Sequence, residues 1–367
     1  MGNNMGTLQK RKFFPQLDAL RALAVFAVML SHFAQVGVGE AGVRLFFVLS
    51  GFLITGILLD SRERIAAGGA LGQELKMFYI RRSIRIFPIY YLVLFLTAVR
   101  NVTPARETFF WHFFYLTNVG GFVSGRDFGM LTHFWSLSVE EQFYSFWPFL
   151  ILLLPRKYFM PLLLSLVLLA PIFRDLAFAA GWHGNYVWLL PSQLDALGLG
   201  ALLALCFHRT PTRDGLQTIF PTWIAFVSGV IALICQFWQS GLAWNLHRFC
   251  EVVFFAWLVG GAAIGFGGMF GWLLNLASLR YLGRISYGIY VYHNFANFLA
   301  HKPLRLLNIP YPHSLWLSLP LEIGVSIGCA SISWHFLEKP LNSLKDRFRP
   351  SENGRKPLAE SSVTVHL

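Results

Sequence analysis

RALAVFAVMLSH, residues 21–32, is a run suited to lipid that begins with an arginine and ends with a histidine. Apart from Ser31, the residues between Arg21 and His32 are apolar. In a helix this spacing of about three turns places both side chains on one face, about 16 Å apart along the axis. Asp18, one turn earlier on the same face, is placed to pair with Arg21. The pattern predicts a polar stripe inside a membrane-spanning helix, and its terminal imidazole is either part of a functional site or bonded to a neighbouring helix.

The composition of the whole chain is also that of an integral membrane protein. Of the 367 residues, 55% are hydrophobic and 13% are charged, whereas soluble domains are about 25% charged. Aromatic residues make up 16%, which suits a protein that crosses two membrane interfaces. The net charge of +12 would suggest a nucleic-acid partner for a soluble protein. In a membrane protein, basic residues gather on the cytoplasmic side, and this explains the positive net charge. We therefore expect a lipid bilayer as partner and no nucleic acid.

Cysteine chemistry is not indicated by this sequence. All four cysteines lie in apolar segments, with no CxxC pair. A disulfide framework or a zinc site is therefore not expected, and the thiols are expected to be buried and inert. We expect no metal cofactor. The residues are Cys206, Cys235, Cys250 and Cys329.

Ten apolar segments approach the length of about 20 residues that a bilayer-spanning helix needs. Pro88 interrupts the third segment, which transmembrane helices tolerate when neighbours satisfy the freed backbone. The aromatic stretch 109–118 is too short to span, and we expect it at the interface or as a re-entrant segment. The sequence predicts an all-α, polytopic membrane protein with about ten transmembrane helices. The expected spans are 17–37, 42–59, 84–99, 134–154, 158–178, 186–207, 219–238, 250–270, 284–300 and 314–337.

The basic residues predict how these spans are oriented. Of the 30 lysines and arginines, 21 fall on the side that carries both termini and seven on the other, with Arg21 and Arg44 left inside apolar segments. The positive-inside rule then places both termini in the cytoplasm of a multi-pass plasma (inner) membrane protein. We expect a cytoplasmic segment at 1–16, one membrane domain at 17–341, and a polar, disordered cytoplasmic tail at 342–367.

Three arginines stand at the cytoplasmic mouth of the third span, in FYIRRSIRIFPIYY, residues 78–91. Arg85 follows Arg81 and Arg82 at spacings of four and three, which places all three on one side of a helix. Arginine forks suit phosphates, so the group could clamp a ligand with several phosphates, such as coenzyme A. Topology determination and contacts with lipid headgroups are the alternative explanation.

Two adjacent acids, Glu140 and Glu141, lie among aromatic residues in HFWSLSVEEQFYSFWP, residues 133–148. One of these carboxylates could orient an imidazole such as His32 or share a proton with it, since both lie in the outer half of the expected bundle. The alternative is an interfacial segment that keeps both acids in water, with Ser138 as the helix N-cap.

Other polar residues in the apolar segments are weaker candidates. Arg44, at the outer start of the second span, could hold Glu40 or face a cavity. Gly51 and Gly56 in that span predict close helix packing. A buried Asp195 needs a partner or a proton. The remaining candidates are Ser286, Tyr287, Tyr290, Tyr292 and His293 near the ninth span, and Glu338 at the end of the tenth.

Seven stretches, in order and covering 17–341, together resemble the acyltransferase 3 family of membrane proteins. The resemblance implies about ten helices and an enzyme that transfers an acyl group, commonly acetyl, rather than an amino-acyl group. It implies cytoplasmic acyl-CoA as donor and a carbohydrate hydroxyl as acceptor, as in O-acetylation of a surface polysaccharide. The stretches are LDALRALAVFAVMLSH, FFVLSGFLI, FYIRRSIRIFPIYY, FWSLSVEEQFY, LDALGLGALLA, YLGRISYGIYVYH and FLEKPL.

The resemblance also implies roles for particular residues. The family's Arg-x10-His pattern falls on Arg21 and His32, with His32 the expected catalytic base, and its RxxR pattern falls on Arg82 and Arg85, expected at the CoA phosphates. The acids carried over are Glu140, Glu141 and Glu338. One departure is Gln193, where relatives often have an arginine two residues before the aspartate, and it leaves the partner of Asp195 open.

Two mechanisms and two other functions stay open at this point. His32 could deprotonate the acceptor for direct attack, or it could carry the acyl group as an acyl-imidazole. The acceptor could instead be cytoplasmic, an antibiotic or a lipid. Buried charges would also suit a proton-coupled transporter, but the paired interrupted helices typical of one are not visible. The acyl group, the acceptor and the oligomeric state cannot be read from the sequence.

Overall fold

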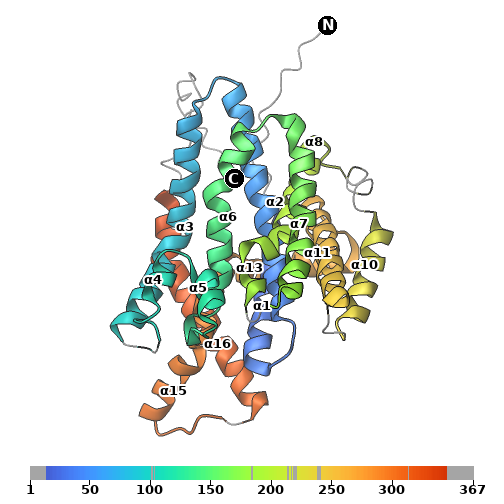
Figure 1. Cartoon of the computed structure of the whole chain (residues 1–367). Helices are drawn as coiled ribbons and strands as arrows, with labels where there is room; N and C mark the ends of the chain where they lie inside the picture. Colours follow the sequence, from blue (N-terminus) through green and yellow to red (C-terminus); the bar gives the residue numbers. More distant parts are fainter. Residues whose placement is uncertain are drawn as a thin grey trace, which may run out of the picture.

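The computed structural model describes residues 14–344, except 101, 103, 183–184, 213–214, 216, 218–220, 238–240 and 313. Most of the expected segment 1–16 and of the expected tail 342–367 therefore lies outside the described residues. The described secondary structure is helical and forms one elongated bundle (Figure 1). The helices are α1 (Pro15–Ala34), α2 (Gly39–Ala66), α3 (Leu71–Val99), α4 (Phe109–Phe113), α5 (Thr117–Ser124), α6 (Phe134–Leu153), α7 (Phe159–Ala179), α8 (Leu194–Arg209), α10 (Thr222–Cys235), α11 (Gly241–Ile264), α12 (Gly268–Leu274), α13 (Ala277–Arg284), α14 (Ser286–Tyr292), α15 (Ala296–Leu306), α16 (Leu315–Ser333) and α17 (Lys339–Ser343).

The all-helical prediction is confirmed, but the count of about ten spans is not. Among the described residues, seven helical stretches are long and apolar enough to cross a membrane. They correspond to seven of the ten expected spans, and α3 begins at Leu71 rather than at residue 84. The other three fall short for different reasons. Helix α6 contains the two glutamates, α10 has 14 residues, and the expected span 284–300 is divided among α13, α14, a 3-10 turn and α15.

Four helices run parallel and begin at the same end of the bundle, namely α2, α6, α8 and α11. Contacts between α2 and α6 pair Ser50 with Glu140 and Arg62 with Ile151, so both helices advance together. The contacts of α2 with α8 and with α11 also move forward along both helices, so these helices run parallel to α2 as well. This end also carries the last turn of α1, because α1 and α2 are joined by a short hairpin at 35–38. We call it the His32 end. The opposite end carries the turn between α2 and α3 (Figure 1).

Helices α2 and α8 touch backbone to backbone. A Cβ added to Gly51 would lie 2.1 Å from the Leu197 carbonyl oxygen, and one added to Gly200 would lie 2.2 Å from that of Val48. Small residues permit such an approach between membrane helices. The expectation of close packing is thus confirmed for Gly51 but wrong for Gly56, which has open space around its Cβ position.

Helix α1 lies against α13 equally closely. A Cβ on Gly283 would lie 1.6 Å from the Asp18 carbonyl oxygen, so a side chain there cannot be accommodated. After α13, helix α14 continues alongside α1, and this brings His293 next to His32. This packing fixes the polar residues of α1 and α14 relative to one another.

The aromatic stretch at 109–118 forms the short helix α4 and the start of α5, consistent with a segment too short to span. Its histidine, His112, is fully buried between two threonine hydroxyls, those of Thr108 at 3.1 Å and Thr117 at 2.9 Å. Burial lowers the pKa of His112 to about 4, so the imidazole is neutral at pH 7 and serves as a hydrogen-bonding brace.

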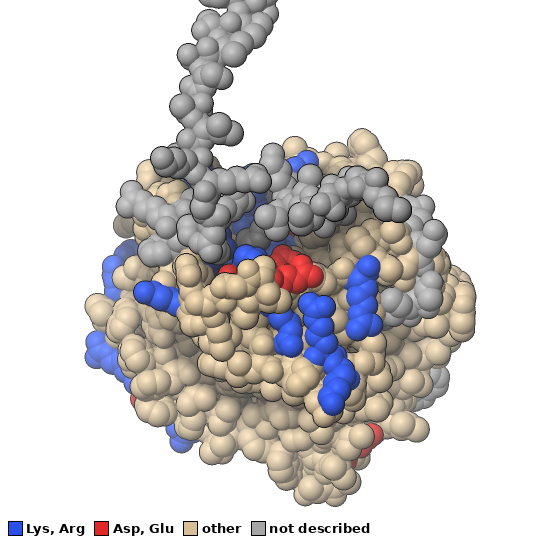
Figure 2. Space-filling view, turned by 90° about the horizontal axis from the view of Figure 1, so that it is seen from above, with Lys and Arg blue, Asp and Glu red and all other residues tan. Residues whose placement is uncertain are grey.

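Exposed basic residues gather at the end opposite to His32. Figure 2 views the molecule from this end and shows several lysine and arginine side chains on it. Lys76 near the start of α3, Arg156 and Lys157 before α7, and Arg209 at the end of α8 are exposed there. By contrast, Arg174 and Arg248, two of the seven basic residues counted on the other side, are buried.

Candidate active site

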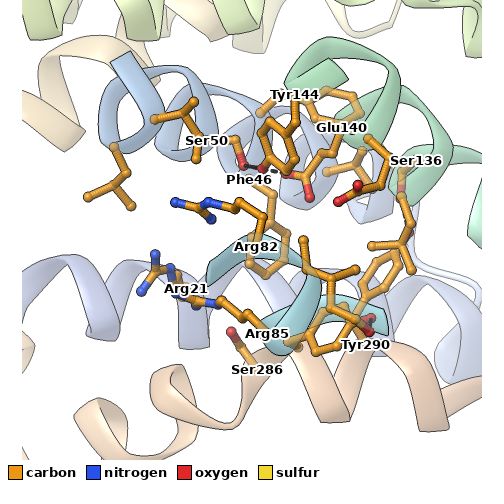
Figure 3. Close-up of a pocket in the computed structure, with 18 residues that line it drawn as sticks. Arg21, Phe46, Ser50, Arg82, Arg85, Ser136, Glu140, Tyr144, Ser286 and Tyr290 are labelled. Atoms are coloured by element: carbon orange, nitrogen blue, oxygen red, sulfur yellow. Dashed lines mark hydrogen bonds between the residues drawn. The ribbon is translucent and has the colours of Figure 1, made fainter. Parts of the chain in front are cut away.

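One polar cavity lies between α1, α2, α3, α6 and α14, near the middle of the bundle. It contains about 800 Å³ of empty space, part of it open to solvent. Figure 3 shows that the arginine head groups gather on one side of the cavity, while Glu140 and Ser136 lie toward the other. Its polar lining residues are Arg21, Ser50, Arg82, Arg85, Ser136, Glu140, Glu141, Tyr144, Ser286, Tyr287 and Tyr290.

Three arginines from two helices supply the positive charge of this cavity. Arg21 of α1 is paired with Asp18 at 3.0 Å, as its spacing predicted. Arg82 and Arg85 of α3 have no carboxylate within 4 Å among the described residues, and Arg82 instead lies over the Tyr144 ring at 5.5 Å. Arg81 does not line the cavity. The structure thus replaces the expected trio of Arg81, Arg82 and Arg85 by Arg21, Arg82 and Arg85.

The two glutamates of α6 face the arginines and not the histidine. Glu140 accepts a hydrogen bond from the Ser50 hydroxyl, which also accepts one from Tyr144 at 2.9 Å. Glu141 has a buried Oε1 with no hydrogen-bond partner among the described residues. Neither glutamate hydrogen-bonds to His32 within the described part of the chain. The sequence placed the glutamates and His32 at a similar depth in the membrane. In the structure, however, the glutamates of α6 point toward α3 and not toward the end of α1.

His32 of α1 belongs instead to a group of three histidines, with His133 just before α6 and His293 just after α14. The His32 ring lies 4.8 Å from that of His293, which lies 4.9 Å from that of His133. His32 Nδ1 lies 2.9 Å from the Val28 carbonyl oxygen, to which only a protonated nitrogen can donate. This assigns the proton to Nδ1 and leaves a lone pair on Nε2. His32 is exposed, whereas His133 and His293 are buried.

Tyr290 separates the cavity from the three histidines. It lines the cavity, and its ring lies 5.5 Å from both buried imidazoles. Its hydroxyl donates to the His133 carbonyl oxygen at 2.9 Å and lies 2.5 Å from the Ser136 hydroxyl. The arginines and His32 therefore stand on opposite sides of one hydrogen-bonded tyrosine.

A second polar cluster lies at the His32 end, between α2, α8 and α11. Arg44 donates to Glu40 at 2.9 Å and to Glu251 at 2.6 Å. Arg248 donates to the same Glu40 carboxylate at 2.5 Å. Arg44 therefore binds Glu40, which is one of the two arrangements expected from the sequence. It also binds a second carboxylate, from α11.

The partner of Asp195 is Arg174 of α7, with an Nη2–Oδ2 distance of 2.8 Å. Their side chains are only 1% and 2% exposed. Arg174 also donates to the Ser192 carbonyl and to Asn245 Oδ1, both at 2.6 Å. Gln193, which departs from the family pattern, accepts from Arg248 at 3.4 Å instead of supplying a charge to Asp195.

The remaining candidates lie around the cavity or behind it. Tyr287 lines the cavity, and its hydroxyl donates to the Ile86 carbonyl at 2.7 Å. Glu338 is buried in a π-helical turn, Trp334–Glu338, with Oε1 3.2 Å from where a Cβ on Gly288 would lie. Reasoning from sequence missed His133, Arg174 and Arg248. The usable signal was an arginine inside the apolar segment 158–178 and another at the edge of 250–270.

Metal binding has no site in the described part of the chain. No group of three or more histidines, cysteines or acids is arranged there to hold an ion.

The architecture is thus that of a helical membrane protein with an arginine-lined cavity and a histidine beyond it. Residues 14–336 match the family model described as an acyltransferase domain, Acyl_transf_3. The chain belongs to the acyltransferase 3 family.

Its relatives include peptidoglycan-modifying enzymes. The chain is 28% identical to the peptidoglycan O-acetyltransferase OatA of Listeria monocytogenes, over 91% of this chain and 57% of that protein. It is 29% identical to YrhL of Bacillus subtilis, over 91% and 56%. It is 26% identical to the O-acetyltransferase OatA of Staphylococcus aureus, over 90% and 57%. The chain spans about half the length of these curated relatives. No solved structure matches it.

Proposed function

We propose that this protein is a membrane O-acyltransferase that moves an acyl group, most simply acetyl, from cytoplasmic acyl-CoA to a hydroxyl of a cell-surface carbohydrate. Family membership supports the reaction class. Relatives named as peptidoglycan O-acetyltransferases support a polysaccharide acceptor.

The observation that carries the proposal is the position of Arg82 and Arg85: both line the cavity, and neither forms an ion pair within 4 Å among the described residues, although Glu140 and Glu141 lie across from them. Charged side chains at membrane depth are costly and usually mark a functional site. Two guanidinium groups on one helix face suit a pyrophosphate, because each can donate two parallel hydrogen bonds. Arg21 adds a third donor group from α1.

His32 is the proposed base for the transfer. With its proton held on Nδ1 by Val28, the Nε2 lone pair can take the proton of the acceptor hydroxyl. The alkoxide oxygen then bonds to the thioester carbonyl, the carbon–sulfur bond breaks, and the proton passes to the thiolate of CoA. In the two-step alternative the same lone pair first takes the acyl group. In either case the acyl group has to pass Tyr290.

Binding of acetyl-CoA to the purified full chain in lipid nanodiscs tests the donor site. We expect Arg82→Ala and Arg85→Ala each to raise the Kd about tenfold or more, since a charge-assisted hydrogen bond contributes about 1.5–3 kcal/mol. The loss should be smaller at high salt, where the wild-type contact is already screened.

The matched control is Arg156→Ala, which removes an exposed arginine from the end opposite to His32. Its Kd should equal that of the wild type. Unchanged affinity in both cavity variants would reject the cavity as the CoA site and favour a lipid-headgroup role for these arginines.

A further inference from the structure

The arginine-lined cavity has two chemically different ends. Arg82 lies over the Tyr144 ring at 5.5 Å, so Tyr144 marks the arginine end. Ser136, near the start of the same helix, marks the opposite end together with Tyr290 (Figure 3). Ser136 and Tyr144 are eight residues apart on α6, which corresponds to about 12 Å along the helix axis. We call the end at Ser136 the Tyr290 end.

Aromatic rings close the Tyr290 end. Phe46 of α2 and Tyr290 of α14 form an edge-to-face pair with ring centroids 6.2 Å apart. Rings with centroids about 4.5–7 Å apart are in contact, so an alkyl chain does not fit between these two. In the segment 42–51 of α2, Phe46 and Ser50 are the two residues that are not buried, and both line the cavity. The Phe46 ring therefore forms a stop for a ligand that enters from the arginine end.

The polar groups at the Tyr290 end already have partners. The Tyr290 hydroxyl donates to the His133 carbonyl oxygen at 2.9 Å, and it lies 2.5 Å from the Ser136 hydroxyl. Val43 of α2 adds another apolar side chain to the lining. A charged or hydroxylated group would lose its hydration here without gaining new hydrogen bonds. The closed end therefore suits the hydrocarbon tail of an acyl group.

The length of the proposed donor brings its thioester to this end. The pantetheine arm of CoA has about twelve bonds between its phosphate oxygen and its sulfur, as many as four peptide residues, and so extends to about 14 Å. With the phosphates held by Arg82 and Arg85, an arm of this length spans the cavity. Little room then remains between the thioester and the Phe46 ring for the acyl chain.

We infer that Phe46 determines which acyl chains the donor site accepts. The space between Phe46, Val43 and Tyr290 holds a two-carbon acyl group and excludes chains of four carbons or more. The inference rests on the proposed acyl-CoA donor. It adds the class of acyl group and the side chain that selects it.

The test compares the Kd values of free CoA, acetyl-CoA and butyryl-CoA for the full chain in nanodiscs. We expect the wild type to bind butyryl-CoA about tenfold or more weakly than acetyl-CoA, because the two additional methylene groups meet the Phe46 ring. Phe46→Ala removes this ring. The ratio of the butyryl-CoA Kd to the acetyl-CoA Kd should then fall about tenfold, which is the gain that burial of two methylene groups predicts.

The ratio of the two Kd values is the readout, because a general loosening of the cavity would change both values alike. The Kd of free CoA should stay at the wild-type value in Phe46→Ala, since free CoA has no acyl group to meet the ring. Phe46→Leu keeps an apolar side chain and should give an intermediate ratio, which provides a measurement if the alanine variant does not fold.

The matched control is Phe149→Ala, which removes a phenylalanine that is 44% exposed on α6 and does not line the cavity. Its Kd values for all three CoA compounds should equal those of the wild type.

Two results would overturn the inference and leave the proposed donor standing. One is a wild-type chain that binds butyryl-CoA as tightly as acetyl-CoA. The other is a wild-type ratio in the folded Phe46 variants. If the wild type binds none of the three CoA compounds, the proposed donor is rejected, and the inference is rejected with it.

Discussion

His32 owes its chemical readiness to one hydrogen bond from its own helix. Because Val28 holds the proton on Nδ1, Nε2 can act as a base without a carboxylate partner. The proposed catalytic role of His32 is therefore compatible with glutamates that face the arginines. In the proposed reaction, acyl-CoA would contact the arginines of the cavity and the acceptor would contact His32.

His32→Ala should therefore lower acyl transfer by about 10²–10⁴-fold, the usual contribution of a general base. Acetyl-CoA binding should persist, because His32 does not line the arginine cavity. Transfer to a saccharide by the reconstituted protein and donor binding would be measured side by side. His335→Ala, at an exposed histidine after α16, is the control. Normal turnover in folded His32→Ala would refute the assignment.

The buried Arg174–Asp195 pair should matter for stability. Asp195→Ala leaves a buried guanidinium without its carboxylate, and we expect a loss of about 3–5 kcal/mol in the free energy of unfolding. Glu63→Gln breaks the exposed contact with His208 and should cost less than about 1 kcal/mol. Denaturant titration in detergent measures both. Similar losses for the two variants would mean that the burial of the Arg174–Asp195 pair is unimportant.

For single residues, only side-chain pairs within one helix could be predicted from the sequence. The Asp18–Arg21 pair follows from helical spacing, and it was confirmed. The partner of Asp195 could not be predicted, because Arg174 reaches it across two antiparallel helices. The orientation of Glu140 depends on which face of α6 meets α3, and the apolar pattern does not specify a face when lipid and protein neighbours are equally apolar.

Among the helices, α2 does most to organise the site. It supplies Ser50 to the arginine cavity, Glu40 and Arg44 to the second polar cluster, and Gly51 to the contact with α8. Its neighbours α6, α8 and α11 follow its direction. The sequence predicted α2, α6, α8 and α11 as spans, but it did not predict that the other three pack around α2, because these contacts join residues far apart in the chain.

Two glycines on α2 make a matched pair for testing this contact. Gly51→Ala would drive a methyl group into the Leu197 carbonyl, and such overpacking costs about 1–3 kcal/mol. Gly56→Ala meets nothing within 4 Å, and should be neutral or stabilising by about 0.4–1 kcal/mol. Thermal unfolding in detergent compares them. Equal stability of the two variants would show that the helices separate at little cost.

The broken segment at 277–306 shows why the helix count was not predicted well. Its apolar residues are numerous enough to suggest one span, yet the chain forms three short helices there. The breaks bring Ser286 and Tyr290 to the cavity and His293 to His32. A continuous helix was the simplest expectation from hydropathy, and the need to place polar residues explains the departure.

For the whole molecule, the proposal requires donor and acceptor to arrive from opposite sides of the membrane. The exposed basic residues at the end away from His32 support a cytoplasmic location for that end. The arginine cavity and the histidines would then lie along one route, with Tyr290 between them.

Cysteine labelling in intact cells tests this orientation, after Cys206, Cys235, Cys250 and Cys329 are replaced. Ser124→Cys, at the exposed end of α5, should react with a membrane-impermeant thiol reagent. Ala67→Cys, in the exposed turn after α2, should react only once the cells are opened. Ser61 is unsuitable, because it is buried. The reverse pattern would invert the orientation and make the acceptor cytoplasmic.

The backbone contact between α2 and α8 has a mechanical consequence. A transporter exposes its cargo alternately to each side by rocking one half of the protein against the other. Helices that meet through Gly51 and Gly200 have no cushion of side chains between them, so they cannot slide without breaking the contact. In the proposed reaction, the pair α2–α8 would therefore stay still. Only a group as small as a two-carbon acyl unit, and not a sugar, would then have to move past it.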